Sequence, residues 1–163
     1  MADFLRVDFV PGYLKALRAH VDLRTIRRGR LRVVADPFHA AGAGVMPALL
    51  GTMCVEIHGD RDPLFGGLVP EPISPNLAAL QEEVRRRRAS IGLAFDGDGD
   101  RLGVVDERGR VVTAQEVLAV LALHLRRVRR ESGAIVKTVS CTALLDAIAR
   151  QEGLELAETP IGF

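Results

Sequence analysis

Short apolar runs rich in β-branched residues alternate along the chain with segments of helical periodicity. The runs that we predict as strands are residues 31–35, 52–58, 90–95, 102–106, 110–113, 134–140 and 154–158. The segments that we predict as helices are residues 10–27, 45–51, 76–89, 114–130 and 142–151. Alternation of strands and helices at this spacing predicts a layered α/β fold.

A long segment rich in glycine and proline, residues 59–75, interrupts this pattern between a strand and a helix. Ordered loops of this length in compact domains often carry function. A second turn, at residues 107–109, separates two short apolar runs and predicts a hairpin.

Three carboxylates directly follow the apolar run 90–95: Asp96, Asp98 and Asp100, separated by Gly97 and Gly99. Like charges in one tight turn repel each other, so the arrangement costs stability unless a cation or several donors offset the charge. The two glycines allow backbone conformations that curl the carboxylates around one point. Oxygen ligands alone favour Mg²⁺, Mn²⁺ or Ca²⁺ over zinc. The pattern therefore predicts a metal site at a strand's carboxyl end.

Three other interpretations fit parts of this loop. A solvated turn does not require three carboxylates. An EF-hand places acids at the first, third and fifth positions, which fits, but needs glycine at the sixth, where this chain has Arg101, and helices on both sides. A haloacid-dehalogenase-like phosphatase would use Asp96 as its nucleophile, with Asp98 two residues later. We find no later pair of acids to complete that site.

Composition and charge narrow the function classes. The formal net charge is +1, which is too small to indicate nucleic acid or an anionic membrane as the main partner. The run of four arginines at residues 85–88 is interpreted as the solvated end of a helix. Cys54 and Cys141 lack metal-binding spacing. The first residues lack the pattern of a signal peptide, so we expect a cytoplasmic protein.

Several segments together resemble the α-D-phosphohexomutases, the phosphoglucomutase/phosphomannomutase family. Residues 95–101 (FDGDGDR) match the metal loop of that family, DGDxDR. Residues 33–42 (VVADPFHAAG) resemble its VVxDPxHGAG stretch, with Ala40 in place of the usual glycine. Residues 62–72 resemble the loop between the two halves of its second domain, and residues 159–163 (TPIGF) resemble its sugar-recognition loop.

The resemblance implies an α/β/α domain with a mixed sheet at residues 1–109, the second domain of the family, followed by a partial third domain at residues 110–163. It implies that Asp96, Asp98 and Asp100 hold Mg²⁺ and that Arg101 lies beside the reacting phosphate. Thr159 and Gly162 would belong to the sugar loop. His39 and Glu71 are equally compatible with structural and functional roles. The expected substrates are glucose or mannose 1- and 6-phosphates.

The chain also departs from the family. The phosphoserine loop Thr-x-Ser-His-Asn-Pro and the Gly-Glu-Glu-Ser-Gly sugar motif do not occur in it. We therefore expect a fragment, natural or engineered, that does not turn over hexose phosphates by itself. The alternative is a non-catalytic module that binds a metal or a sugar phosphate. Apolar residues of the partial third domain, from Val117 to Val128, are expected to promote self-association.

Overall fold

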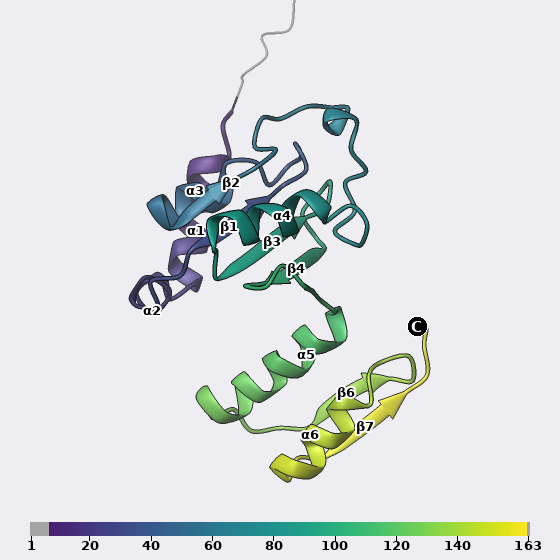
Figure 1. Ribbon diagram of the computed structural model, residues 1–163. Coiled ribbons are helices and arrows are strands. Elements are labelled where there is room, and N and C mark those ends of the chain that lie inside the picture. Colours follow the sequence, from purple (N-terminus) through teal and green to yellow (C-terminus); the bar gives the residue numbers. More distant parts are fainter. Residues whose placement is uncertain (1–6, 163) are drawn as a thin grey trace, which may run out of the picture. The chain divides into compact units, whose positions relative to one another are not determined.

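The computed structural model describes residues 7–162 (Figure 1). The chain divides into two compact units, residues 1–111 and residues 112–163. Each unit has a hydrophobic core of its own.

The first unit is built on a five-stranded mixed sheet with the order β2-β1-β3-β4-β5. Its strands are β1 (Val33–Asp36), β2 (Cys54–Glu56), β3 (Ile91–Phe95), β4 (Leu102–Asp106) and β5 (Val111–Val112). Strand β1 runs parallel to β2 and β3, whereas β4 runs antiparallel to β3. Because Phe95 pairs with Leu102, residues 96–101 form the connection between two adjacent strands.

Helices cover both faces of this sheet. Successive side chains of β1 point to opposite faces, so this strand contributes to the core on each side. Val34 faces the helix α4 (Ala78–Arg87), whose Leu80 and Val84 are fully buried. Val33 and Ala35 face the layer that contains α2 (Leu23–Arg28) and α3 (Val45–Leu50). The helix α1 (Val10–His20) packs against α3. The predicted layered α/β/α fold with a mixed sheet is confirmed (Figure 1).

The prediction of one continuous helix over residues 10–27 is wrong. Helix α1 ends at His20, and Val21 has an extended backbone. The carboxylate of Asp22 then caps α2 by accepting hydrogen bonds from the backbone N–H groups of Arg24 and Thr25, each at 3.1 Å. An aspartate that caps a new helix favours a break at this point over continuation of the first helix.

Several other predicted boundaries shift by a few residues. Short 3₁₀ turns occupy η1 (Gly51–Met53) and η2 (Phe65–Gly67), the second inside the long loop 59–75. The predicted helix 114–130 is α5 (Ala114–Leu123), which continues as the π-helical segment η3 (His124–Val128).

The second unit has two parallel strands, β6 (Ile135–Thr138) and β7 (Leu156–Thr159), connected through the helix α6 (Leu144–Glu152). Its small core joins α5 to α6 through Ala119, Leu145 and Ile148. Lys137 of β6 is buried, and its ammonium group donates a hydrogen bond to Asp146 at 2.6 Å and pairs with Glu158 at 3.1 Å. This ion-pair cluster ties both strands to α6.

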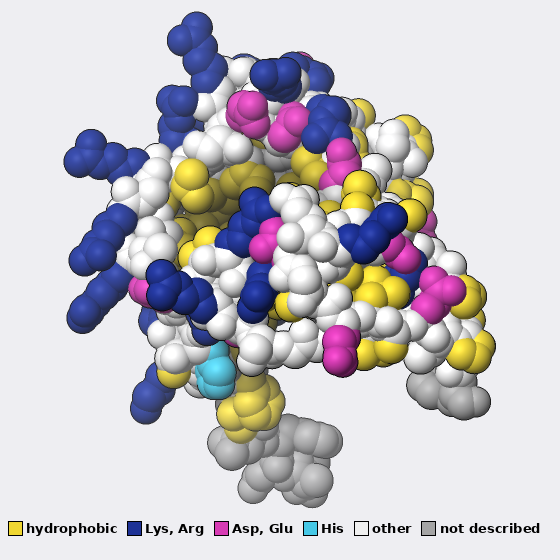
Figure 2. Space-filling model, turned by 90° about the horizontal axis from the view of Figure 1, so that it is seen from below, with side chains coloured by type: hydrophobic (Ala, Val, Ile, Leu, Met, Phe, Trp, Pro, Cys, Tyr) yellow, Lys and Arg dark blue, Asp and Glu magenta, His cyan; other side chains and the backbone are white. Residues whose placement is uncertain are grey.

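The second unit also exposes apolar side chains that its own core does not cover. Hydrophobic side chains are visible between the charged groups in the space-filling view (Figure 2). In α5, η3 and β6, four hydrophobic side chains are more than half exposed: Val120, Leu121, Val128 and Val136. Within the described part of the chain, no helix has the length and apolar character needed to cross a membrane.

Candidate metal centre

The acidic loop lies at the carboxyl end of β3, where the chain turns back into the antiparallel strand β4. Asp96 is the first residue after β3 and is only 1% exposed, whereas Asp98 and Asp100 are exposed. One carboxylate oxygen from each of the three residues lies within 4.8 Å of the others. Three converging carboxylates form a donor set suited to a hard divalent cation such as Mg²⁺. The residues present therefore fit the predicted metal.

Asp96 organises the loop through three hydrogen bonds. Its Oδ1 accepts from the backbone N–H groups of Gly99 and Arg101, both at 3.0 Å, and its Oδ2 accepts from Nε of Arg101 at 2.7 Å. The backbone hydrogen bond from Arg101, together with its guanidinium, holds the pKa of Asp96 well below the ordinary value. Gly99 has a φ of +82°, a conformation that glycine adopts without steric cost.

The electrostatics of the loop show that its negative charge is only partly offset. The hydrogen bond with Asp96 and the repulsion from Asp98 and Asp96 raise the pKa of Asp100. Nε of Arg101 lies 3.9 Å from Oδ1 of Asp100, too far for a hydrogen bond. A cation bound between the three carboxylates would relieve this repulsion directly.

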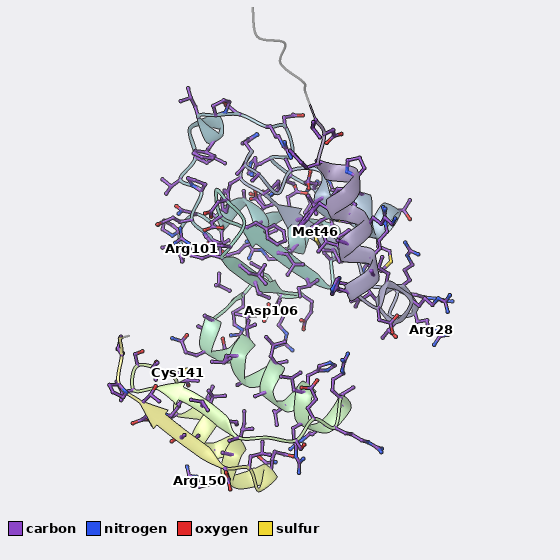
Figure 3. The ribbon with its side chains drawn as sticks, turned by 180° about the vertical axis from the view of Figure 1, so that it is seen from behind. Arg28, Met46, Arg101, Asp106, Cys141 and Arg150 are labelled. Carbon is purple, nitrogen blue, oxygen red and sulfur yellow. The ribbon has the colours of Figure 1, made fainter. Side chains whose placement is uncertain are left out.

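The long loop 59–75 brings Glu71 to the same site. Oε1 of Glu71 lies 3.6 Å from a terminal nitrogen of Arg101, whose side chain is 58% exposed. Figure 3 labels the position of Arg101. The hydrogen bond to Asp96, with the charges of Asp96 and Glu71, raises the pKa of Arg101. The guanidinium is thus held between the end of β3 and the long loop, with donors left for an incoming anion.

A second group of polar residues lies at the ends of β1 and β2; His39 of this group was a candidate from the sequence, whereas Asp36 and His58 were missed. Nδ1 of His58 is 3.0 Å from Oδ1 of the fully buried Asp36, which also accepts a hydrogen bond from the backbone N–H of Phe38 at 2.9 Å. His39 donates through Nδ1 to the carbonyl oxygen of Asp60 at 2.7 Å. The sequence signal that could have revealed this contact was an aspartate and a histidine at the ends of two predicted strands, Asp36 and His58.

Beside the acidic loop, a cavity of about 480 Å³ opens between α1, α3 and the end of β3. Asp98 and Gly99 line one side of it, and apolar residues of both helices, including Met46, line the other (Figure 3). The exposed carboxylate of Asp98 therefore faces space large enough for a small ligand or a neighbouring chain segment.

The predicted sugar-loop residues belong to the second unit. Thr159 is the last residue of β7, and its hydroxyl donates a long hydrogen bond of 3.4 Å to the carbonyl of Lys137. Gly162 lies three residues further on with a φ of +123°. Both residues are exposed.

The geometry also decides between the alternatives for the acidic loop. An EF-hand loop joins two helices, but this loop joins β3 to β4, so the EF-hand interpretation is wrong. A phosphatase nucleophile must reach its substrate. Asp96 is buried, and both of its oxygens accept hydrogen bonds within the loop. This arrangement suits a structural ligand better than an attacking group.

Fold and site together define an α/β/α protein with an acidic, oxygen-rich loop at the carboxyl edge of its sheet. Residues 11–109 match the family model of the phosphoglucomutase/phosphomannomutase α/β/α domain II, and residues 113–163 match that of domain III. The chain belongs to the phosphoglucomutase/phosphomannomutase family.

Individual relatives agree with this membership. The chain is 32% identical to a phosphoglucomutase/phosphomannomutase of Thermococcus kodakarensis over 99% of its own length and 36% of that protein. It is 33% identical to a phosphoglucosamine mutase of Bartonella quintana over 85% of its own length and 31% of that protein. The chain thus spans about a third of the length of these relatives.

Solved structures show the same fold. A family protein from Burkholderia thailandensis superposes with a TM-score of 0.80 at 29% identity, covering 97% of this chain and 34% of that chain. A protein from Thermus thermophilus superposes with a TM-score of 0.82 at 32% identity, covering 96% of this chain and 37% of that chain. The Paramecium phosphoglucomutase parafusin, at 23% identity and a TM-score of 0.79, shares the fold.

Proposed function

We propose that this chain is a magnesium-binding part of a cytoplasmic phosphohexomutase, an isomerase that moves a phosphoryl group between two positions of a hexose phosphate. Residues 1–109 correspond to its second domain and residues 110–163 to the first part of its third. The observation that carries the proposal is the convergence of Asp96, Asp98 and Asp100 at the end of β3 in a member of this family.

In this proposal the three aspartates of the loop hold Mg²⁺, each through one oxygen. A hard cation bound there offsets negative charge on a transferring phosphoryl group. Asp96 contributes a ligand whose position is already fixed, because backbone N–H groups orient its carboxylate. The exposed Asp98 and Asp100 are free to adjust to the ion.

Arg101 is the proposed catalytic residue of this chain. Its guanidinium is anchored by Asp96 and directed toward Glu71, yet it is more than half exposed. A planar guanidinium stabilises phosphate oxygens through paired hydrogen bonds. Arg101 would therefore bind and orient the phosphate next to the metal, and Glu71 would keep its side chain in place.

The proposed substrates of the parent enzyme are hexose 1- and 6-phosphates. The relatives include phosphoglucosamine mutases as well as phosphoglucomutase/phosphomannomutases, so amino sugars join the expected glucose and mannose phosphates. Thr159 and Gly162 are proposed sugar contacts. The sequence contains no Thr-x-Ser-His-Asn-Pro loop to accept a phosphoryl group, so we expect no turnover by this chain alone.

Binding of Mn²⁺ tests the metal site without requiring activity, because the electron paramagnetic resonance signal of free Mn²⁺ falls as the ion binds. We expect one site in the wild-type chain and a loss of affinity of about tenfold or more in Asp98→Asn, since the substitution removes a direct ligand. Asp60→Asn, an exposed aspartate outside the loop, is the matched control and should bind normally. Equal binding by both variants would refute the site.

Gel filtration tests the expected self-association. The exposed apolar residues of α5 and η3 support it. We expect a concentration-dependent shift toward a dimer that Val120→Gln and Val128→Gln together reduce. A monomer at every concentration would contradict this part of the proposal.

A further inference from the structure

The four arginines at residues 85–88 are not equivalent in the structure. Arg86 and Arg87 both hydrogen-bond the carboxylate of Glu83, through contacts of 2.6–2.8 Å. They agree with the expected solvated helix end. Arg85 and Arg88, which are also exposed, line an open pocket of about 380 Å³ together with Arg32, Ala89, Ser90 and Glu107. The run therefore divides into Arg86 and Arg87, which share the one carboxylate of Glu83, and Arg85 and Arg88, which line a pocket.

This basic pocket, lined by the six residues just named, lies at the end of the sheet opposite to the metal loop. Ser90 directly precedes β3, whereas Asp96 directly follows it. Because β4 is antiparallel, its far end at Asp106 pairs with Ile91 and lies at the same end as the pocket. Figure 3 labels Arg101 and Asp106 at the two ends of β4. Five residues of extended strand separate the two sites by roughly 17 Å.

The positive charge in the pocket exceeds the negative charge. Arg85 donates to a neutral partner, the carbonyl oxygen of Gly109, at 3.3 Å. Among residues 7–162, no acidic side chain forms an ion pair with Arg32 or Arg88. Glu107 is the single carboxylate of the lining, and Arg108 lies 3.7 Å from it. Three arginines and one glutamate thus line the pocket, and the charge of the glutamate is itself partly balanced by Arg108.

Ser90 adds a hydroxyl donor to the pocket, and two hydrogen bonds to Arg32 hold this residue in position. The hydroxyl oxygen of Ser90 accepts a hydrogen bond from the backbone N–H of Arg32 at 3.1 Å, which leaves its own proton available to a ligand. The backbone N–H of Ser90 donates to the carbonyl of Arg32 at 2.7 Å, so the two residues hold each other in place. Guanidinium groups are the side chains best matched to phosphate oxygens.

We propose that this basic pocket is a binding site for a small anion of the phosphate class with two or more negative charges, separate from the metal site. A volume of about 380 Å³ accommodates a diphosphate group, and three guanidinium groups offset its charge. Arg32, Arg85 and Arg88 are its charged contacts, and Ser90 is its neutral donor. Occupation of the pocket would connect α4, the start of β3 and the β4–β5 turn.

Arg88 provides an unusually clean variant for the test. It follows α4 with a φ of +49°, a left-handed conformation that favours glycine. Arg88→Gly therefore removes the guanidinium while it relieves the backbone, and it should not lower the melting temperature. Arg86→Gln removes the same charge from the same helix end but lies outside the pocket. The two variants separate a built site from a general basic surface.

The experiment is a calorimetric titration of the full 163-residue chain with inorganic pyrophosphate in a metal-free buffer. We expect one saturable site, a loss of about tenfold in affinity for Arg88→Gly and for Arg32→Gln, and a change within about twofold for Arg86→Gln. No saturable binding, or equal losses in Arg86→Gln and Arg88→Gly, would overturn the proposal. Tighter binding of a single-stranded oligonucleotide, growing with its length, would overturn it in favour of nucleic acid.

Discussion

Arg101 and Asp96 join the two ends of the acidic loop, residues 96–101, through two hydrogen bonds. Nε of Arg101 donates to Oδ2 of Asp96 at 2.7 Å, and the backbone N–H of Arg101 donates to Oδ1 at 3.0 Å. The two residues stand at the two ends of the loop that connects β3 to β4. The carboxylate of Asp96, a proposed metal ligand, is thus already held in place by the protein, and the same contact positions the guanidinium of Arg101.

The first prediction concerns stability in the absence of metal. Asp96→Ala should lower the free energy of unfolding by about 2–3 kcal/mol, because it leaves the guanidinium and two backbone N–H groups without their acceptor. Asp98→Ala should leave it within about 0.5 kcal/mol, since its exposed carboxylate only adds repulsion. Urea unfolding measures both values. Equal effects of the two substitutions would mean that Asp96 does not organise the loop.

A second prediction concerns the contact between β4 and the long loop. A Cβ atom at Gly103 would lie 2.6 Å from the carbonyl oxygen of Pro72 and 2.9 Å from its Cβ. Gly103→Ala should therefore destabilise the first unit by about 1–3 kcal/mol and displace the loop that carries Glu71. Gly12→Ala, in a helix with open space around it, is the control and should stabilise by up to about 1 kcal/mol. Thermal unfolding of the Gly103→Ala and Gly12→Ala variants, compared with the wild type, tests both predictions.

The third prediction is the pH dependence of the second unit. The ammonium group of Lys137 lowers the pKa of Asp146, and this carboxylate raises the pKa of Lys137. The stabilisation from Asp146 is present above its unfolded pKa, about 4, and is lost as the pH falls through the lower folded value. The stabilisation from Lys137 is present below its unfolded pKa, about 10.4, and is lost as the pH rises through the higher folded value.

NMR-detected melting of the second unit between acid and neutral pH tests this cluster. The Asp146→Asn variant should be less stable than the wild type at pH 7. Its stability should also fall much less than that of the wild type as the pH is lowered. Glu155→Gln, at an exposed position of the same unit, should change neither property. An unchanged acid decline in Asp146→Asn would exclude the proposed linkage.

A fourth prediction compares the two cysteines. Burial, the largest cause, and the charge of Glu56 raise the pKa of Cys54 to about 11. At pH 8 only on the order of one Cys54 in a thousand is a thiolate, and the side chain is buried. Iodoacetamide should therefore modify the half-buried Cys141 before Cys54, as read by peptide mass spectrometry. Modification of Cys54 at the same rate would show that β2 opens readily.

Much of this architecture could be predicted because local patterns agree with it. The β-branched run at Val33–Asp36 and the apolar run at Ile91–Phe95 are strands, and the acidic loop follows the second of them directly. The break between α1 and α2 was missed because helical periodicity continues across Asp22, whose capping role depends on a single side chain. Local patterns cannot show such a choice.

The missed parts of the sites depend on contacts between distant segments. Asp36 meets His58 only because β1 and β2 pair in parallel, and Glu71 reaches Arg101 only through the path of the long loop. The arginine run at residues 85–88 reads as one uniform helix end in the sequence. The pocket that distinguishes Arg85 and Arg88 from their neighbours also needs Arg32, which lies more than fifty residues earlier in the sequence. The backbone N–H of Arg32 is hydrogen-bonded to the hydroxyl of Ser90.

The most direct test of the metal assignment is a titration of the isotopically labelled chain with Mg²⁺, followed by the amide NMR signals of residues 97–101. We predict saturable shifts of these signals in the wild type, no such shifts in Asp98→Asn, and little change in the signals around the pocket at Arg32 and Ser90. Signals of the loop that stay unmoved at tens of millimolar Mg²⁺, even with glucose 1-phosphate present, would contradict the account.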